Sequence, residues 1–292
     1  MTAIQFGMNL REIGSRQEFH RLVLRLDELG FDVFAAPDHL GAAAPFGVLA
    51  AAGVLSDRLR LRTYVLNIGF WNPALLAREV ATVDRLSGGR AELGLGAGHK
   101  KAEHDAAGLP WYPHAERITR LQATLDEVRT RLADPGHEPK PVQQPIPLMV
   151  AAMSGTGLST AAKHADIVGF AGLKQRKGGQ QGELTFASVA ETEQRVADVR
   201  AEAGDRPYRS DVLIQRVTLD PEPERVATEL AEQLPGTTPE VLLESPFMLL
   251  AKDADTAATE LHRRHEVYGF DSVTTHQPSY EALGEVIAAY RS

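Results

Sequence analysis

The sequence predicts a single α/β domain built as a closed (β/α)8 TIM barrel. Apolar runs rich in β-branched residues recur along the chain, and segments with apolar residues at three- and four-residue spacing separate them. Eight such strand–helix units can be recognised, which is the number that the barrel requires. A doubly wound open sheet is the alternative, and the strand number disfavours it. Because no clear linker divides the 292 residues, we expect one domain over 1–292.

Capping residues mark the helix boundaries in the first half of the chain. Gly30 ends the first helix in the manner of a C-cap. Asn72 and Pro73 open another helix as N-cap and first-turn residue, and Gly88 with Gly89 closes it. In chain order we expect a strand at 4–8, a helix at 16–29, a strand at 31–36, a helix at 46–56, a strand at 61–68, a helix at 73–87 and a strand at 91–97.

The second half continues the same alternation, with polar segments between the units. Proline, glycine and polar residues at 133–145 and 174–187 are typical of loops, and 204–210 is a short turn. The remaining strands are expected at 146–152, 166–172, 211–218 and 270–275. The remaining helices are expected at 116–132, 156–164, 188–203, 222–233, 254–268 and 280–290.

Composition narrows the class of protein. Hydrophobic residues make up 43% of the chain and charged residues 24%, as in globular domains with an ample core. The chain has no cysteine, which excludes disulfides, thiolate metal sites and a cysteine nucleophile. A net charge of −8 argues against non-specific nucleic-acid binding. No apolar run approaches the roughly 18 residues of a membrane span, so we expect a cytoplasmic protein without a membrane or nucleic-acid partner.

The segment 91–100, AELGLGAGHK, raises the question of a nucleotide-binding loop. Its pattern is G-x-G-x-G, whereas a dinucleotide fingerprint needs G-x-G-x-x-G with a helix opening on the last glycine. Here the next strong helix begins only near His114, and the segment belongs to the fourth expected strand. The Rossmann interpretation therefore fails. In a barrel, small residues where a strand ends let a flat ligand approach the backbone on the face that carries active sites.

Polar residues follow several other expected strands. Asp38 and His39 follow the second strand, an ionisable pair where barrels display catalytic groups. The turn 153–157 (MSGTG) precedes a helix and suits a phosphate, which backbone N–H groups and the helix dipole would bind. Lys174 begins a basic cluster after the sixth strand. An ordinary N-cap and solvated loop charges are the alternative interpretations, but together these strand ends suit a planar, phosphorylated ligand.

Over nearly its whole length the chain resembles the bacterial luciferase-like monooxygenase family, and most of all its branch that uses the deazaflavin coenzyme F420. The resemblance rests on 61–67, 72–90 and 92–98, and the sequences PDH at 37–39 and HAD at 164–166 fit the same pattern. It implies a luciferase-like TIM barrel with a loop or helical insertion near the later strands. It also implies a homodimer that binds a flavin or deazaflavin at the mouth of the barrel and acts on a small-molecule substrate.

The resemblance implies a set of site residues by position. Asp38 and His39 would lie near the ring system, with His39 as proton donor or substrate-orienting group and His99 as the alternative proton carrier. The third strand would form a bulge that often contains a non-proline cis peptide. Cofactor contacts are implied for Tyr64, Val65, Leu66 and Asn67 in this bulge, for Ala97 and Gly98 beside His99, for Ala151, Ala152, Met153 and Ser154 along the phosphate arm, and for Lys174 at the phosphate.

Two departures from the family pattern affect these assignments. Relatives that oxidise sugar phosphates place a glutamate directly after the fourth-strand glycines, where this chain has His99. Many relatives have two glycines where this chain has Met153 and Ser154. The spacing of His99, Glu103 and His104 matches no established metal site, so no metal is expected.

The expected function is that of an F420-dependent oxidoreductase, which transfers a hydride between C5 of the deazaflavin and an organic substrate. An apolar rim is expected to receive this substrate; its residues are Phe46, Phe70, Trp71 and Trp111. A two-component FMN-dependent monooxygenase on the same barrel is the close alternative, because both cofactors share the ring shape and the phosphate arm. A non-catalytic protein that binds a flavin or deazaflavin is the alternative of another class.

Overall fold

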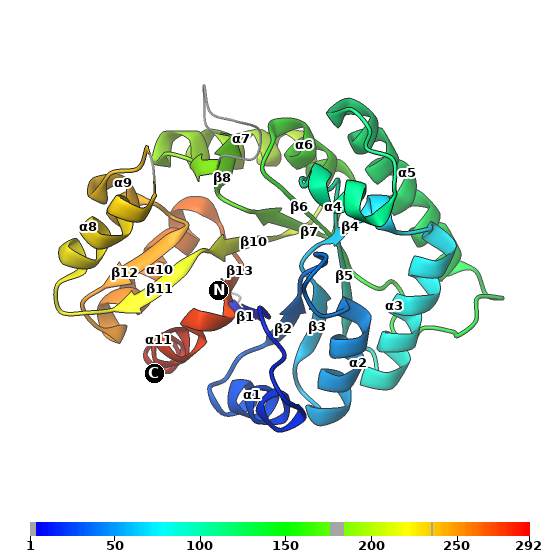
Figure 1. The fold of residues 1–292 in the computed structure, drawn as a ribbon, viewed down its shortest axis with the longest axis horizontal. Helices are drawn as coiled ribbons and strands as arrows, with labels where there is room; N and C mark the ends of the chain where they lie inside the picture. The colour runs from blue at the N-terminus through cyan, green and yellow to red at the C-terminus, as the bar shows by residue number, and fades with distance from the viewer. Residues whose placement is uncertain (1–3, 176–183, 235) are drawn as a thin grey trace.

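The computed structural model describes residues 4–175, 184–234 and 236–292, and its central feature is a closed parallel barrel (Figure 1). The strands follow the order β3-β2-β1-β13-β10-β7-β6-β5-β4, and a further pairing of β3 with β5 closes the ring. The barrel strands are β1 (Gln5–Asn9), β2 (Val33–Ala36), β3 (Arg60–Thr63) with its continuation β4 (Leu66–Asn67), β5 (Ala91–Gly96), β6 (Leu148–Ala152), β7 (Ile167–Phe170), β10 (Arg209–Ile214) and β13 (Ser272–His276). The predicted (β/α)8 fold is confirmed.

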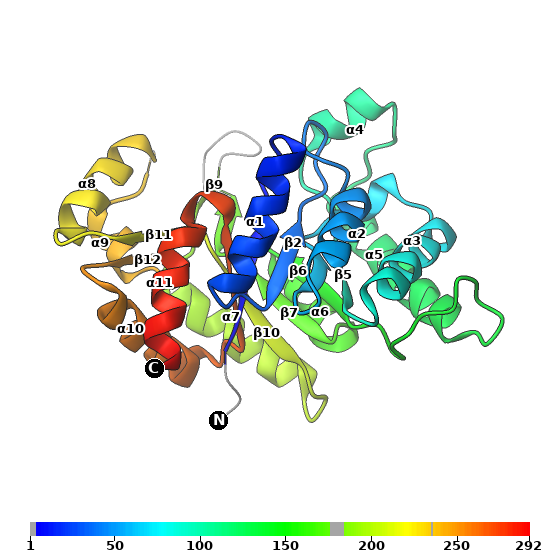
Figure 2. The same cartoon turned by 90° about the horizontal axis from the view of Figure 1, so that it is seen from below.

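Helices surround the barrel and follow its strands, as Figure 2 shows from below. The expected caps are present: the side chain of Asn72 accepts from two backbone N–H groups of the first turn, and Gly88 ends that helix with φ at 68°. The covering helices are α1 (Arg16–Glu28), α2 (Pro45–Leu55), α3 (Pro73–Ser87), α5 (His114–Ala133), α6 (Gly155–His164), α7 (Val189–Ala203), α10 (Ala254–Tyr268) and α11 (Tyr280–Arg291). No helix within the described residues is both long and apolar enough to cross a membrane.

Several short elements were not predicted. The helix α4 (Lys101–Ala107) follows β5, and the expected loop 174–187 is bounded by a hairpin of β8 (Leu173–Gln175) and β9 (Leu184–Phe186). Elements this short show too few periods for a hydrophobic pattern to reveal them. The remaining unpredicted elements are the 3-10 turns η1 (Ile68–Phe70) and η2 (Gln277–Ser279), the helix α9 (Pro239–Glu244) and the strand β12 (Met248–Ala251).

The expected strand 211–218 is two strands. β10 belongs to the barrel and ends at Ile214, whereas β11 (Arg216–Leu219) pairs in parallel with β12 (Met248–Ala251) in a separate sheet. Apolar residues stand on both sides of Gln215, at 212–214 in β10 and at 217 and 219 in β11, so the sequence pattern runs on through the break. Together with α8 (Pro223–Gln233) and α9, this pair forms the insertion near the later strands that the family resemblance implied (Figure 1).

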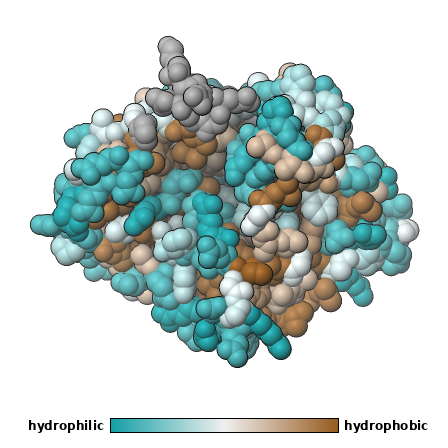
Figure 3. All heavy atoms as spheres, in the orientation of Figure 1, coloured by the Kyte–Doolittle hydropathy of each residue, from teal (hydrophilic) through white to brown (hydrophobic). Residues whose placement is uncertain are grey.

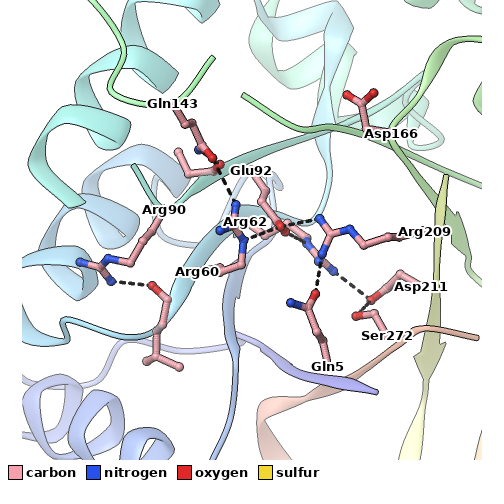
Figure 4. A network of polar contacts seen from close by, with 12 residues as sticks. Gln5, Arg60, Arg62, Arg90, Glu92, Gln143, Asp166, Arg209, Asp211 and Ser272 are labelled. Atoms are coloured by element: carbon pink, nitrogen blue, oxygen red, sulfur yellow. Dashed lines mark hydrogen bonds and ion pairs between the residues drawn. The ribbon is translucent and has the colours of Figure 1, made fainter. Parts of the chain in front are cut away.

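Charged side chains fill part of the barrel interior (Figure 4). Arg62 is fully buried, and its Nε and Nη1 lie 2.6 Å from Glu92 Oε2 and 2.9 Å from Asp211 Oδ1. Arg60 and Arg209 add two guanidinium groups at 2.6 and 2.7 Å from Glu92 Oε1. Burial alone would raise the pKa of Glu92, but these three guanidinium groups outweigh it and hold the pKa far below its usual value. Glu92 is therefore ionised inside the barrel.

Candidate active site at the carboxyl ends of the barrel strands

A cavity of about 410 Å³ lies where the barrel strands end. Its size falls within the roughly 300–1,000 Å³ typical of small-molecule sites. Of the residues predicted for catalysis or for contact with the cofactor, all but Lys174 line this cavity: Asp38, His39, Tyr64, Val65, Leu66, Asn67, Ala97, Gly98, His99, Ala151, Ala152, Met153 and Ser154. The fold therefore brings strand ends that are far apart in the sequence to one place.

His39 has a carboxylate partner that the sequence did not indicate. Its Nδ1 lies 2.9 and 3.1 Å from the two carboxylate oxygens of Glu103, which is on α4. The ring of His99 packs edge-on against that of His39, with 5.4 Å between centroids. Partial burial, His39 and Lys100 lower the pKa of His99. The cavity thus contains two adjacent imidazoles: His39 is paired with a carboxylate, and burial favours the neutral form of His99.

No side-chain hydrogen bond joins Asp38 to His39, although the two residues adjoin after β2. Its Oδ2 accepts from the backbone N–H of Asn67 at 3.0 Å and from Nε1 of Trp71 at 2.9 Å. Successive side chains at a strand end point in different directions, so neighbours in sequence need not meet. Burial raises the pKa of Asp38. Asp38 anchors the bulge that follows β3.

The bulge contains a cis peptide bond between Tyr64 and Val65, as the resemblance implied. The glycines of β5 make room for it. A Cβ on Gly96 would lie 2.7 Å from Val65 Cγ2, and one on Gly98, whose φ is +77°, would lie 2.4 Å from Asn67 Oδ1. The G-x-G-x-G pattern is therefore required by the close approach of two chain segments, which together present backbone and small side chains to the cavity.

The N-terminus of α6 provides a group of hydrogen-bonding atoms suited to an anion. Ser154 Oγ accepts from the backbone N–H of Gly157 at 3.2 Å. Nε2 of His114, from the start of α5, lies 3.1 Å from Thr156 Oγ1 and 3.3 Å from Ser154 Oγ. Helix N-termini with free N–H groups favour phosphate, so this donor set fits the phosphate arm of a flavin or deazaflavin.

Lys174, predicted to contact the phosphate, does not line the cavity. Its ammonium group bonds to both carboxylate oxygens of Glu191, at the start of α7. The other basic residues of that predicted cluster, 176 and 177, lie outside the described residues. Arg117 of α5 lines the cavity instead, with its guanidinium 3.9 Å from the centroid of the Trp111 ring.

Polar residues also line the cavity at the ends of β1, β10 and β13. They are Asn9, Arg11, Gln215 and His276. Gln215 Nε2 lies 3.3 Å from the carbonyl oxygen of Ala171, so its Oε1 accepts from Nε2–H of His276 at 3.2 Å. Burial and the charge of Arg11 lower the pKa of His276 to about 4. His276 is therefore neutral near pH 7.

The expected aromatic rim is wrong in its placement. Phe46 and Trp71 pack edge-on against each other with 5.2 Å between centroids, and Phe70 and Trp111 flank the ring of His104. None of these four aromatic residues lines the cavity. Aromatic residues in mouth loops predicted a binding surface, but they instead form the packing that holds those loops together. Among residues 4–175, 184–234 and 236–292, no cluster of histidine and acidic residues has the arrangement of a metal site.

Comparison with known proteins decides the family. The family model described as luciferase-like monooxygenase matches residues 1–278. This chain belongs to that family. Among solved structures, an F420-dependent secondary alcohol dehydrogenase in complex with an F420-acetone adduct superimposes with a TM-score of 0.78 at 17% identity, covering 99% of this chain and 100% of that one. A long-chain alkane monooxygenase reaches 0.77 at 14% identity, covering 100% and 92%. These likenesses establish the luciferase-like fold.

This luciferase-like protein matches the first of its curated relatives over about two fifths of their own length. An F420-dependent glucose-6-phosphate dehydrogenase of Kribbella flavida is 36% identical over 135 residues, which cover 43% of this chain and 40% of the relative. A 5,10-methylenetetrahydromethanopterin reductase of Methanopyrus kandleri is 32% identical over 136 residues, 44% and 39%. An FMNH2-dependent dimethylsulfone monooxygenase of Pseudomonas putida is 28% identical over 160 residues, 49% and 42%. The relatives are oxidoreductases that differ in cofactor.

Sequence reasoning missed several cavity residues of this luciferase-like protein. Glu103, His114 and Arg117 were not assigned to the site, because they lie on helices whose faces a strand-end argument does not orient. Asn9 was also missed, although it is the last residue of a barrel strand. The rule that barrel active sites collect residues from every strand end could have found Asn9.

Proposed function

We propose that this luciferase-like protein is an F420-dependent oxidoreductase, which transfers a hydride between C5 of the deazaflavin and an organic substrate. The observation that carries the proposal is that one cavity combines three features. A floor of backbone and small side chains suits a planar ring, the α6 N-terminus suits a phosphate, and His39 offers an imidazole for proton transfer. The names of F420-dependent glucose-6-phosphate dehydrogenases among the relatives support the same choice of coenzyme.

The chain would hold the coenzyme between β4, β5 and α6. Val65 and Leu66 of the bulge would support the ring, with Gly98 giving close access from β5. The hydroxyl groups of Ser154 and Thr156 would donate hydrogen bonds to the phosphate, together with N–H groups of the first turn of α6. When bound, the deazaflavin supplies a carbon that gives or accepts the hydride, while the protein supplies orientation and electrostatics.

His39 would carry the proton that accompanies hydride transfer. Oxidation of a hydroxyl-bearing carbon releases a proton, and reduction of a carbonyl takes one up. His39, which lines the cavity and is paired with Glu103, could accept the proton in the oxidation and donate it in the reduction. The polar wall of Asn9, Gln215 and His276 would face the substrate. We therefore propose a polar substrate, bound at this wall and not at the expected aromatic rim.

A two-component FMN monooxygenase is the second candidate, and the FMNH2-dependent relative favours it. The two coenzymes share the ring shape and the phosphate, so the cavity accepts the outline of both. The deciding experiment is fluorescence titration of the purified apoprotein with F420 and with FMN. Micromolar or tighter binding of F420 with weaker binding of FMN is the expected result. Tight binding of FMN alone would overturn the coenzyme assignment, and binding of neither would overturn the function.

A second copy of the chain is the proposed partner. The helix α2 has an uncharged sequence, PFGVLAAAGVL, that is apolar on all sides, and such helices are normally buried. Hydrophobic residues nevertheless gather on the surface over α2 and α3 (Figure 3). Val54 is 70% exposed and Leu86 54%, and both line a groove between α1, α2 and α3. We propose that this face is the interface of a homodimer.

A further inference from the structure

Glu103 and His39 form a pair across the cavity wall, 64 residues apart in sequence. We propose that Glu103 is a positioning residue that fixes the tautomer of His39. The catalytic meaning of this inference rests on the proposed function, in which His39 carries a proton. The pairing itself is a property of the protein alone, so it can be tested without coenzyme or substrate.

The geometry assigns the tautomer. An ionised carboxylate only accepts hydrogen bonds, and both oxygens of Glu103 lie within 3.1 Å of Nδ1. Nδ1 of His39 must therefore carry the proton in the neutral ring, which leaves the lone pair on Nε2. Within the described part of the chain, no group hydrogen-bonds to Nε2. The free nitrogen of a cavity-lining imidazole is thus the one that would meet a substrate hydroxyl.

The helix that carries Glu103 is fixed by its next residue. His104 is 1% exposed; its Nδ1–H donates to the carbonyl oxygen of Pro110 at 2.9 Å, and its Nε2 accepts from Nδ2 of Asn67 at 3.0 Å. Successive residues of a helix point about 100° apart. When His104 faces the barrel, Glu103 therefore faces His39. The side chain of Glu103 is itself only 13% exposed, which strengthens its electrostatic effect.

The charges around His39 come from four segments. Asp38 adjoins it on the chain, His99 follows β5, Glu103 and Lys100 belong to the start of α4, and Arg117 projects from α5. Lys100 Nζ lies 3.5 Å from Glu103 Oε1 and is half-exposed, so solvent weakens its effect. Glu103 is the only one of these groups that hydrogen-bonds to the imidazole among the described residues.

The test uses two substitutions of Glu103 and one matched control on the same helix. E103A removes both charge and acceptor, whereas E103Q keeps an acceptor oxygen and removes the charge. D105N is the control, because Asp105 of α4 is 57% exposed and pairs only with Lys101, at 2.6 Å, among the described residues. The probe is the ¹⁵N NMR signals of the imidazole nitrogens of the apoprotein across a pH titration, and H39Q assigns the His39 signals.

We expect E103A to shift His39 from the Nδ1–H form toward the Nε2–H form that free imidazoles prefer. E103Q keeps an acceptor oxygen and should therefore keep the Nδ1–H form. D105N should not change the tautomer. An Nε2–H form in the parent protein, or an unchanged tautomer in E103A, would overturn the proposal. If E103A does not fold, the tautomer of the parent protein still decides. Failure of coenzyme binding would overturn the proposed function and leave this result standing.

Discussion

The hydroxyl group of Tyr64 donates a 2.6 Å hydrogen bond to Asp211 Oδ2, which joins the floor of the cavity to the buried charges of the barrel. The other oxygen of Asp211 accepts from Arg62 at 2.9 Å, Ser272 at 2.6 Å and Thr274 at 2.8 Å. Burial, together with the negative charge of Asp211, raises the pKa of Tyr64 well above its usual value, so the phenol remains a donor. The bulge is therefore held from inside the barrel as well as from Asp38.

Replacing Asp211 by alanine should destabilise the protein strongly. The change leaves Arg62 buried with one of its two anions, and breaking a buried ion pair costs roughly 3–5 kcal/mol. Tyr64→Phe removes only the hydrogen bond from the phenol and should cost about 1.5–3 kcal/mol. Urea unfolding of both variants measures the difference. Equal losses would show that the charge of Asp211 contributes no more than its bond to Tyr64.

Stability should fall as the pH drops below about 6.5, in part because of His276. Burial and Arg11 lower its pKa to about 4 in the folded protein, from an ordinary value of 6.5. Between these two values the unfolded chain binds a proton that the folded chain does not, so acid favours unfolding. His276→Gln should therefore lose less stability than the parent between pH 7 and pH 4.5. Parallel pH profiles of the urea midpoint would contradict this.

The sequence predicts features that depend on neighbouring residues better than it predicts contacts between residues that are far apart in the chain. Runs of apolar residues and caps such as Asn72 are local, and they located every barrel strand. The family resemblance predicted that Ala151 and His39 belong to the site, and both line the cavity, because strand ends converge in any barrel. The bond from His39 to Glu103 depends on how one short helix is rotated, and no local pattern records that rotation. Lys174 shows the converse, since its local basic cluster could not reveal Glu191.

His114 should contribute to the binding of the coenzyme phosphate. Its Nε2 lies beside the hydroxyl groups of Ser154 and Thr156 at the start of α6. His114→Ala should weaken binding of F420 by about 10-fold, since a hydrogen bond to a charged group contributes roughly 1.5–3 kcal/mol and solvent reaches this exposed site. The phosphate-free deazaflavin chromophore serves as the control ligand in the same fluorescence titration. An equal loss for both ligands would place His114 away from the phosphate.

Val54→Lys should convert a dimer to a monomer. The side chain of Val54 is 70% exposed on α2, so a lysine there is solvated in the monomer and costs little stability. In the proposed interface the same ammonium group would be desolvated opposite apolar residues. Size-exclusion chromatography with light scattering measures the mass, against the 31.7 kDa of one chain. Val267→Lys is the control, because Val267 is also exposed but belongs to α10, none of whose residues lines that groove. A V54K protein that keeps the parent's dimeric mass would place the interface elsewhere.

Replacing His39 separates a catalyst from a protein that only binds the coenzyme. His39→Gln removes the imidazole that would exchange the proton, and loss of a general acid or base lowers the rate by about 10²- to 10⁴-fold. Affinity for F420 should change little, because the bulge and the α6 N-terminus make the main contacts. His99→Gln is the comparison, since His99 has no carboxylate partner among the described residues and should lose less activity. Stopped-flow absorbance of F420 oxidation or reduction, tested over a panel of alcohols and carbonyl compounds, measures both variants. A His39 variant with the parent's rate would assign proton transfer to another group, whereas a parent protein that binds F420 tightly but turns over no substrate would favour a binding protein.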